Sequence, residues 1–150
     1  QVTLVPDGVN AITSNAGWDT IQHQSFLKEV IGEFQQNGIR TSVFIGTDLK
    51  QIEAAAKTGA DRIELYTEDF ATQYDMGNKE AIKPYTEAAV LAHSLGLGIN
   101  AGHDLSLENI QFFKENIPHL AEVSIGHALI AESLYLGLEN VVNMYLHRLQ

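Results

Sequence analysis

Short runs of alternating apolar and polar residues recur along the chain, separated by longer stretches with the spacing of amphipathic helices. Short β-like runs predict five strands: Val2 to Val5, Thr41 to Ile45, Arg62 to Tyr66, Gly98 to Asn100, and Glu122 to Ile125. The helical spacing predicts five helical segments: Thr20 to Gln36, Leu49 to Lys57, Glu80 to Ser94, Leu107 to Asn116, and Ala128 to Leu149 with a break near Gly137. Strands that alternate with helices are typical of βαβ units and a parallel sheet.

Residues that start and stop helices support these bounds. Left-handed C-terminal caps are predicted at Gly38, Gly59 and Gly96, and N-terminal caps at Asp48, Asn78 and Ser106. The segment from Thr67 to Asn78 is the longest stretch without a clear period, so we expect an irregular binding loop or lid there.

The strand pattern discriminates between an open sheet and a closed barrel. Strands covered by helices on both faces read as continuous apolar runs, whereas here Ile63 and Leu65 alternate with Arg62, Glu64 and Tyr66. One apolar face and one polar face favour a (β/α)8 TIM barrel, whose interior becomes polar near the active end. Five strands do not close a barrel. We therefore expect residues 1–150 to be the C-terminal part of a single barrel domain, about strands 4 to 8, with roughly three N-terminal units missing.

Composition restricts the function class. The formal net charge of −10 argues against nucleic acid or an anionic membrane as the main partner. No apolar run approaches the roughly 20 residues of a membrane span, and no signal-peptide pattern opens the chain. The absence of cysteine excludes disulfides and thiolate metal sites, so we expect a cytoplasmic protein.

Candidate chemistry gathers where the strands end, which is where such barrels place their active sites. The polar, titratable or glycine positions at these ends are Asp7, Thr13, Asp48, Glu64, Asn100, His103, Gly126 and His127. Glu64 falls inside the barrel, where an unpaired carboxylate is costly to bury. It is either a structural ion-pair partner, of Arg62 or of a residue outside this chain, or a charge directed at a cationic intermediate.

His103 follows a strand in the run Asn100-Ala101-Gly102-His103. A histidine at this place can act as a general acid or base, and the alternative is a loop residue that only caps the next helix. No HxH or HExxH spacing accompanies it, so we expect no metal.

Gly126-His127-Ala128 ends the last strand and opens a helix. Barrels of this kind often bind phosphate there, at backbone N–H groups and the positive end of the helix dipole. The alternative is a glycine needed only for a tight turn. No lysine lies at a strand end, which argues against a Schiff-base aldolase.

Several runs, taken together and in order, resemble the pyridoxine 5'-phosphate synthase family. They are Leu4-Val5-Pro6, Ile63-Glu64-Leu65, Asn100-Ala101-Gly102-His103 and Ile125-Gly126-His127-Ala128, with Ser42-Val43-Phe44-Ile45, Gln51-Ile52-Glu53-Ala54-Ala55-Ala56 and Ser94-Leu95-Gly96-Leu97 between them. The resemblance implies a TIM barrel that condenses 1-deoxy-D-xylulose 5-phosphate with 3-amino-2-oxopropyl phosphate to pyridoxine 5'-phosphate, phosphate and water. It implies no cofactor and a homo-oligomer, commonly an octamer.

The resemblance also assigns roles to residues. His103 is similar to the family's proton donor and Glu64 to its transition-state stabiliser. Thr13 matches the threonine that contacts deoxyxylulose phosphate, and Gly126 and His127 match the pair that holds the aminoketone phosphate. Asp104 stands where the family often has a glycine that contacts substrate, and a carboxylate beside phosphate would repel it.

Other groups of the family have no counterpart here. They are a histidine and a glutamate on early strands and the phosphate-binding arginines, so we expect the chain alone to be inactive. Two other readings stay open: another phosphate-binding TIM-barrel enzyme, or a flavodoxin-like binding module without enzymatic activity, which also has about five βα units.

Overall fold

A five-stranded parallel sheet, with the strands in chain order, forms the centre of the computed structural model, which describes residues 1–8 and 10–150. The strands are β1 (Val2–Leu4), β2 (Thr41–Ile45), β3 (Arg62–Tyr66), β4 (Gly98–Gly102) and β5 (Leu120–Ser124). Each pairs in parallel with its successor. The predicted α/β class is confirmed. A doubly wound sheet such as flavodoxin's reverses its strand order partway, and this sheet does not.

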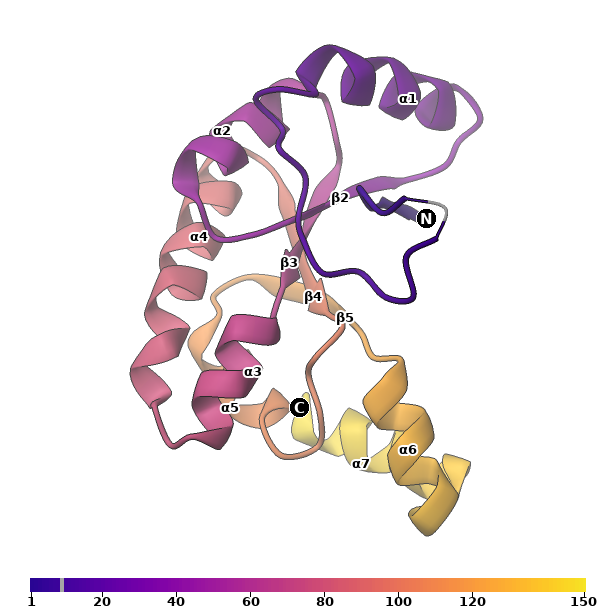
Figure 1. Ribbon diagram of the computed structural model, residues 1–150, viewed down its shortest axis with the longest axis vertical. Helices are drawn as coiled ribbons and strands as arrows, with labels where there is room; N and C mark the ends of the chain where they lie inside the picture. Colours follow the sequence, from indigo (N-terminus) through magenta and orange to yellow (C-terminus); the bar gives the residue numbers. More distant parts are fainter. Residues whose placement is uncertain (9) are drawn as a thin grey trace.

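Helices follow every strand. They are α1 (Gln24–Gln36), α2 (Leu49–Lys57), α3 (Glu68–Asp75), the 3₁₀ turn η1 (Lys79–Ile82), α4 (Lys83–Ser94), α5 (Ile110–Asn116), α6 (His127–Leu136) and α7 (Leu138–Arg148). Figure 1 shows α1, α2 and α4 succeeding one another around an arc in chain order, with α6 and α7 at its far end. Within the described residues, none of these helices combines the length and apolarity needed to cross a bilayer.

The two faces of the sheet differ in polarity. One face, including Ile45, Leu65 and Ala101, packs into a buried core with apolar residues of the helices. The opposite face, called here the inner face, carries Ser42, Phe44, Arg62, Glu64, Tyr66, Asn100, Gly102, Glu122 and Ser124, which share rows of the parallel register. The alternation of polar and apolar side chains along β3 places its polar residues on this face, as the sequence pattern predicted.

The helix signals in the sequence have mixed outcomes. Gly38, Gly59 and Gly96 have φ of 70°, 84° and 83°, so the predicted left-handed caps are confirmed. Asp48 caps α2 by accepting from two backbone N–H groups. Asn78 takes the predicted N-cap position, before η1, although its side chain makes no capping hydrogen bond there. The prediction for Ser106 is wrong, because the N-cap of α5 is Asn109.

The prediction of an irregular loop from Thr67 to Asn78 is wrong, because α3 occupies most of it. Phe70, Ala71 and Tyr74 have helical spacing: Phe70 is fully buried in the core, Tyr74 packs against it and Ala71 is buried. The helix is short and otherwise polar, so its period is weak in the sequence and burial of three apolar residues decides its conformation.

Ion pairs tie the strands together where they begin. Arg40, just before β2, reaches both carboxylate oxygens of Glu122 on β5 at 2.7 and 2.9 Å. Arg62 donates to Asn100 at 2.8 Å and lies 3.6 Å from Glu122. These contacts span β2 to β5 across the inner face.

Asp61, which precedes β3, is held in the same region. It accepts from the backbone N–H and hydroxyl of Thr41, at 2.7 and 2.8 Å, and from Gln35. These donors, the Thr41 N–H above all, hold the pKa of the Asp61 carboxyl below its usual value.

Candidate functional site

His103 lies in a strained turn at the end of β4. Its φ is 70°, and the N–H of Asp104 donates to the carbonyl of Gly102 at 3.0 Å, which closes a γ-turn of the rare positive-φ form. The N–H of His103 in turn donates to the carbonyl of Ser124 on β5 at 3.1 Å. Strain of this kind is characteristic of functional sites.

Gly102 makes this turn possible. A Cβ at this position would lie 2.3 Å from the Ser124 carbonyl oxygen, so only glycine lets β5 approach closely enough to bond to His103. The buried hydroxyl of Thr67, which follows β3, also donates to the Gly102 carbonyl. The run Gly102-His103 thus dictates the backbone geometry that presents the imidazole.

The His103 ring is held at both nitrogens. Nε2 lies 2.7 Å from the Thr13 hydroxyl, and Nδ1 lies 3.0 Å from Oδ2 of Asp104. Three aromatic rings surround it: those of Phe44, Tyr66 and His127 lie 6.4, 6.0 and 6.1 Å away between centroids. The ring does not cap the following helix, which was the alternative reading of the sequence.

Thr13 reaches His103 from the segment that precedes α1. Trp18 anchors this segment, since its backbone N–H donates to Phe44 and its indole N–H to Leu4, at 2.9 and 3.0 Å. Gly17 packs so tightly against β2 that a Cβ there would lie 2.6 Å from the backbone of Ile45 and Gly46. The segment therefore crosses the C-terminal ends of the strands in a defined position.

Glu64 lies deeper on the inner face, with 7% of its surface exposed. Its Oε2 accepts from the Thr3 hydroxyl at 2.8 Å. Burial raises the pKa of the Glu64 carboxyl, and the Thr3 hydrogen bond and the nearby His103 partly offset the rise. Arg62, the predicted ion-pair partner, instead contacts Asn100 and Glu122. No cation pairs with Glu64 among the described residues, so the interpretation of Glu64 as an ion-pair partner of Arg62 is wrong.

Gly126 is the N-cap of α6, and no side chain caps this helix. Its φ is −108°, and a Cβ placed on it would meet nothing within 4 Å. Packing therefore does not demand glycine here. The first backbone N–H groups of α6 open onto unfilled space, which suits an anion.

Two adjoining cavities bring the predicted site residues together. One of about 410 Å³ is lined by Glu64, His103, Ser124, Ile125, Gly126 and His127. The second, of about 570 Å³, is lined by residues that include Thr13, His103, Asp104, His127, Glu68 and Asp75. They share His103 and His127, and each has the size of a small-molecule site. All six predicted residues line one cavity or the other.

Other residues at the strand ends have different tasks. Asp48 caps a helix, and Asp7 accepts from the Ser14 hydroxyl within its own segment. Sequence reasoning missed Thr3, Thr67 and Ser124. Thr67 could have been predicted from the sequence, because it follows β3 directly, as His103 follows β4.

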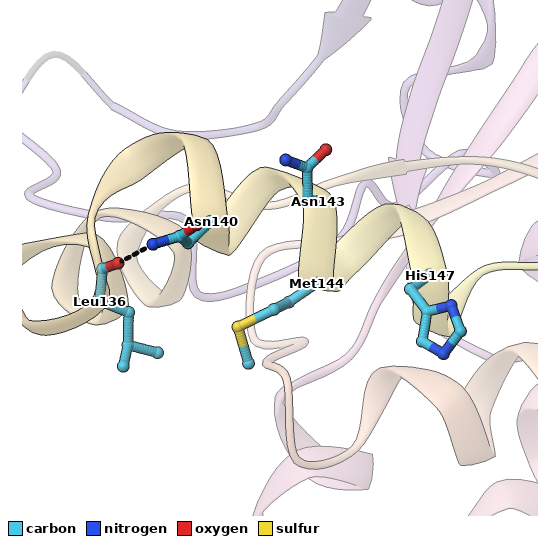
Figure 2. Close-up of a pocket in the computed structure, with 5 residues that line it drawn as sticks. All are labelled: Leu136, Asn140, Asn143, Met144 and His147. Carbon is cyan, nitrogen blue, oxygen red and sulfur yellow. Dashed lines mark hydrogen bonds between the residues drawn. The ribbon is translucent and has the colours of Figure 1, made fainter.

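A separate groove lies on the outer surface of the last helices. Figure 2 shows its lining residues, Leu136 at the end of α6 and Asn140, Asn143, Met144 and His147 on α7. None of the predicted site residues lines it, and Asn140 bonds only within the helix pair, to the Leu136 carbonyl at 2.9 Å.

Comparison with known proteins identifies what the chain is similar to. The family described as "Pyridoxal phosphate biosynthesis protein PdxJ" matches residues 1–150. The pyridoxine 5'-phosphate synthase of Flavobacterium johnsoniae is 73% identical over 150 residues, that of Christiangramia forsetii 65%, and that of Cytophaga hutchinsonii 63%. Each match covers 100% of this chain and 63% of the relative, so the chain spans less than two thirds of these proteins.

Proposed function

Because this chain belongs to the family of pyridoxal phosphate biosynthesis protein PdxJ, we propose that it forms part of a pyridoxine 5'-phosphate synthase. The proposed reaction condenses 1-deoxy-D-xylulose 5-phosphate with 3-amino-2-oxopropyl phosphate to pyridoxine 5'-phosphate, phosphate and water. One observation carries the proposal: side chains from separate strand ends surround two joined cavities, in a chain that matches named synthases along its full length.

The proposed fold is a (β/α)8 barrel to which this chain contributes about strands 4 to 8. The unreversed strand order and the polar inner face support it. β1 and β5 each pair with one strand only in the described part of the chain, so both sheet edges offer backbone groups to further strands. Activity is therefore expected of the complete barrel, and the experiments below use that enzyme.

The chemistry assigns each residue a task. The substrate amine supplies the nitrogen of the imine, so no enzyme lysine is required. His103 protonates the oxygen that leaves, and the buried carboxylate of Glu64 stabilises positive charge as it develops on the imine nitrogen. Thr13 is proposed at the deoxyxylulose phosphate, with Asp104 beside it and directed at His103, and Gly126 and His127 at the phosphate of the aminoketone.

The reaction itself is tested by mixing both phosphorylated substrates with the purified enzyme. We expect pyridoxine 5'-phosphate and inorganic phosphate in equal amounts, and neither when the aminoketone is left out. An aldolase-type enzyme would instead be inactivated by borohydride in the presence of one substrate, through a reduced lysine adduct. That outcome would contradict the proposal.

The phosphate site is tested by Gly126→Val. Because a Cβ has room there, the fold should be retained while access to the helix N-terminus is blocked. We expect the Michaelis constant for the aminoketone phosphate to rise by about 10-fold, the scale of one hydrogen bond to a charged group. Gly46→Val, at another uncrowded strand end, is the matched control. An unchanged constant in Gly126→Val would remove this assignment.

We also propose a homo-oligomer in the cytoplasm. Large apolar side chains stand exposed on α6 and α7, among them Leu134 at 81%, Tyr135 at 89% and Leu138 at 58%. Exposed apolar area of this kind is typical of surfaces that another element or subunit covers. Light scattering on the purified enzyme measures the number of subunits.

A further inference from the structure

The contacts of the His103 ring restrict where its proton can lie. An ionised carboxylate only accepts hydrogen bonds, so the 3.0 Å contact with Oδ2 of Asp104 requires a proton on Nδ1. The neutral ring then has its lone pair on Nε2. The Thr13 hydroxyl, 2.7 Å away, must donate to that lone pair. Only one neutral tautomer satisfies both contacts.

Asp104 is itself fixed by the backbone. Its N–H donates to the Gly102 carbonyl at 3.0 Å and also lies 3.3 Å from the Thr67 hydroxyl, which is fully buried. The γ-turn that strains His103 therefore also sets the direction of the next side chain. The N–H of Asp104 is engaged within the protein, and its carboxylate is directed at the imidazole.

We propose that Asp104 is a positioning residue: it holds the proton of His103 on Nδ1, so that Nε2 is the atom that exchanges a proton with the substrate. This inference rests on the proposed function of the site. When the ring takes up a second proton, that proton is on Nε2, and its transfer to a leaving oxygen returns the ring to the same tautomer. The carboxylate thereby keeps the ring ready for the next cycle without being protonated itself.

This role explains a carboxylate where a phosphorylated substrate binds. A free carboxylate would repel the phosphate, whereas one engaged by the imidazole directs its charge at the ring. Other titratable groups face His103 from the neighbouring elements: Glu64 and Tyr66 on β3, Glu68 and Asp75 on α3, and His127 on α6. Among the described residues, Asp104 is the carboxylate that hydrogen-bonds to the ring.

Two substitutions separate positioning from substrate contact. Asp104→Asn keeps the shape but offers an amide N–H that bonds to unprotonated Nδ1, which favours the wrong tautomer. Asp104→Gly releases the ring. We expect turnover to fall by about 10-fold in the glycine variant and further in the asparagine variant, with Michaelis constants for both substrates nearly unchanged. Asp69→Asn, which removes an exposed charge from α3 at a position that lines neither cavity, is the matched control and should leave turnover unchanged.

The tautomer is measured directly by nitrogen NMR of the complete enzyme labelled at histidine, with His103→Asn used to assign the signals. We expect Nδ1–H in the wild-type enzyme, a mixture in Asp104→Gly and a shift toward Nε2–H in Asp104→Asn. A wild-type ring protonated on Nε2, or loss of affinity instead of turnover in both variants, would overturn the inference. The spectra need no substrate, so an enzyme that fails to make product refutes the proposed function while the tautomer is still decided.

Discussion

The two ends of the same sheet are both polar, yet they are built differently. Where the strands begin, Arg40, Arg62 and Glu122 neutralise one another, and Asp61 is saturated by donors from Thr41 and Gln35. Glu64, in the same register row as Glu122, has only a hydroxyl as partner, and His103, where the strands end, sits in a strained turn. The polar groups at the strand starts bond to one another, whereas those toward the strand ends remain available to a ligand.

The difference explains why polarity alone does not locate a site. The paired side chains at the strand starts connect β2, β3 and β5. Because they already bond to one another, they are not free to bind or to react with a ligand. Barrels use this end for stability and the opposite end for catalysis. Strain, incomplete pairing and burial of a lone carboxylate together distinguish the end proposed for catalysis.

The largest expected effect is at His103. His103→Asn should lower turnover by about 10²-fold or more, the scale of general acid–base catalysis, while substrate affinity stays nearly intact. The fold should survive, because asparagine tolerates positive φ better than most residues. Steady-state kinetics from about pH 6 to pH 9 measure this, and near-normal turnover over that range would reduce His103 to a loop residue.

Gly102→Ala tests the turn that carries the histidine. The new Cβ would overlap the Ser124 carbonyl, so β4 and β5 must separate locally. We expect a loss of about 3 kcal/mol in the free energy of unfolding, together with reduced turnover. Gly46→Ala, where a Cβ meets open space, is the control and should change neither by much. Equal stability of the two variants in denaturant titrations would show that the close approach is not required.

Asp61→Ala probes the opposite end. It leaves the buried Thr41 N–H without its acceptor, so we expect a loss of about 1–2 kcal/mol in stability with turnover unchanged. Because the pKa of Asp61 is lowered from 3.8 by folding, its contribution is present above that pH and is lost as the pH falls through the folded pKa. Melting curves of wild type and variant should therefore converge in acid. A fall in turnover would mean that the two ends are coupled.

The smallest expected effect is a gain in thermal stability, in Glu64→Gln. Burial raises the pKa of Glu64 above its ordinary 4.5, so its contribution to stability is fully present below that pH and is lost as the pH rises through the folded pKa. Glu64→Gln keeps the acceptor for Thr3 and removes the buried charge. The variant should melt above the wild type by a few degrees at about pH 8 and not at about pH 4, while its turnover falls. A variant less stable at both values would contradict this account.

The sequence predicts the scaffold best where one physical signal dominates. β3 has the predicted bounds because apolar and polar residues alternate without interruption, and β2 because β-branched and aromatic residues predominate in it. α2 has its predicted bounds because Asp48 caps it. β4 is longer than predicted, since Ala101 and Gly102 have little strand preference and are ordered by pairing with β3 and β5. α3 was missed for a related reason: tertiary burial, not local preference, makes it helical.

The site also divides into residues that the sequence could predict and contacts that it could not. Glu64, His103 and Gly126 could be chosen because each lies at or near a strand end. The contact between Thr13 and His103 could not, because it joins residues 90 positions apart through a segment without a period. The contact of Asp104 with His103, which fixes the tautomer, depends on a γ-turn. The sequence indicates this turn only through the preceding Gly102.

The unreversed strand order also has a consequence for how the chain folds. Each strand pairs with the next one along the chain, so the pairings that build the sheet are more local in sequence than the side-chain contacts across it. The contacts of Thr13 with His103 and of Arg40 with Glu122 span 90 and 82 residues. They form once neighbouring strands are in place, so side-chain changes at Thr13 or His103 should alter the unfolding rate and leave the folding rate nearly unchanged. We therefore expect the proposed site to assemble late in folding, so that its residues can change without slowing the formation of the sheet.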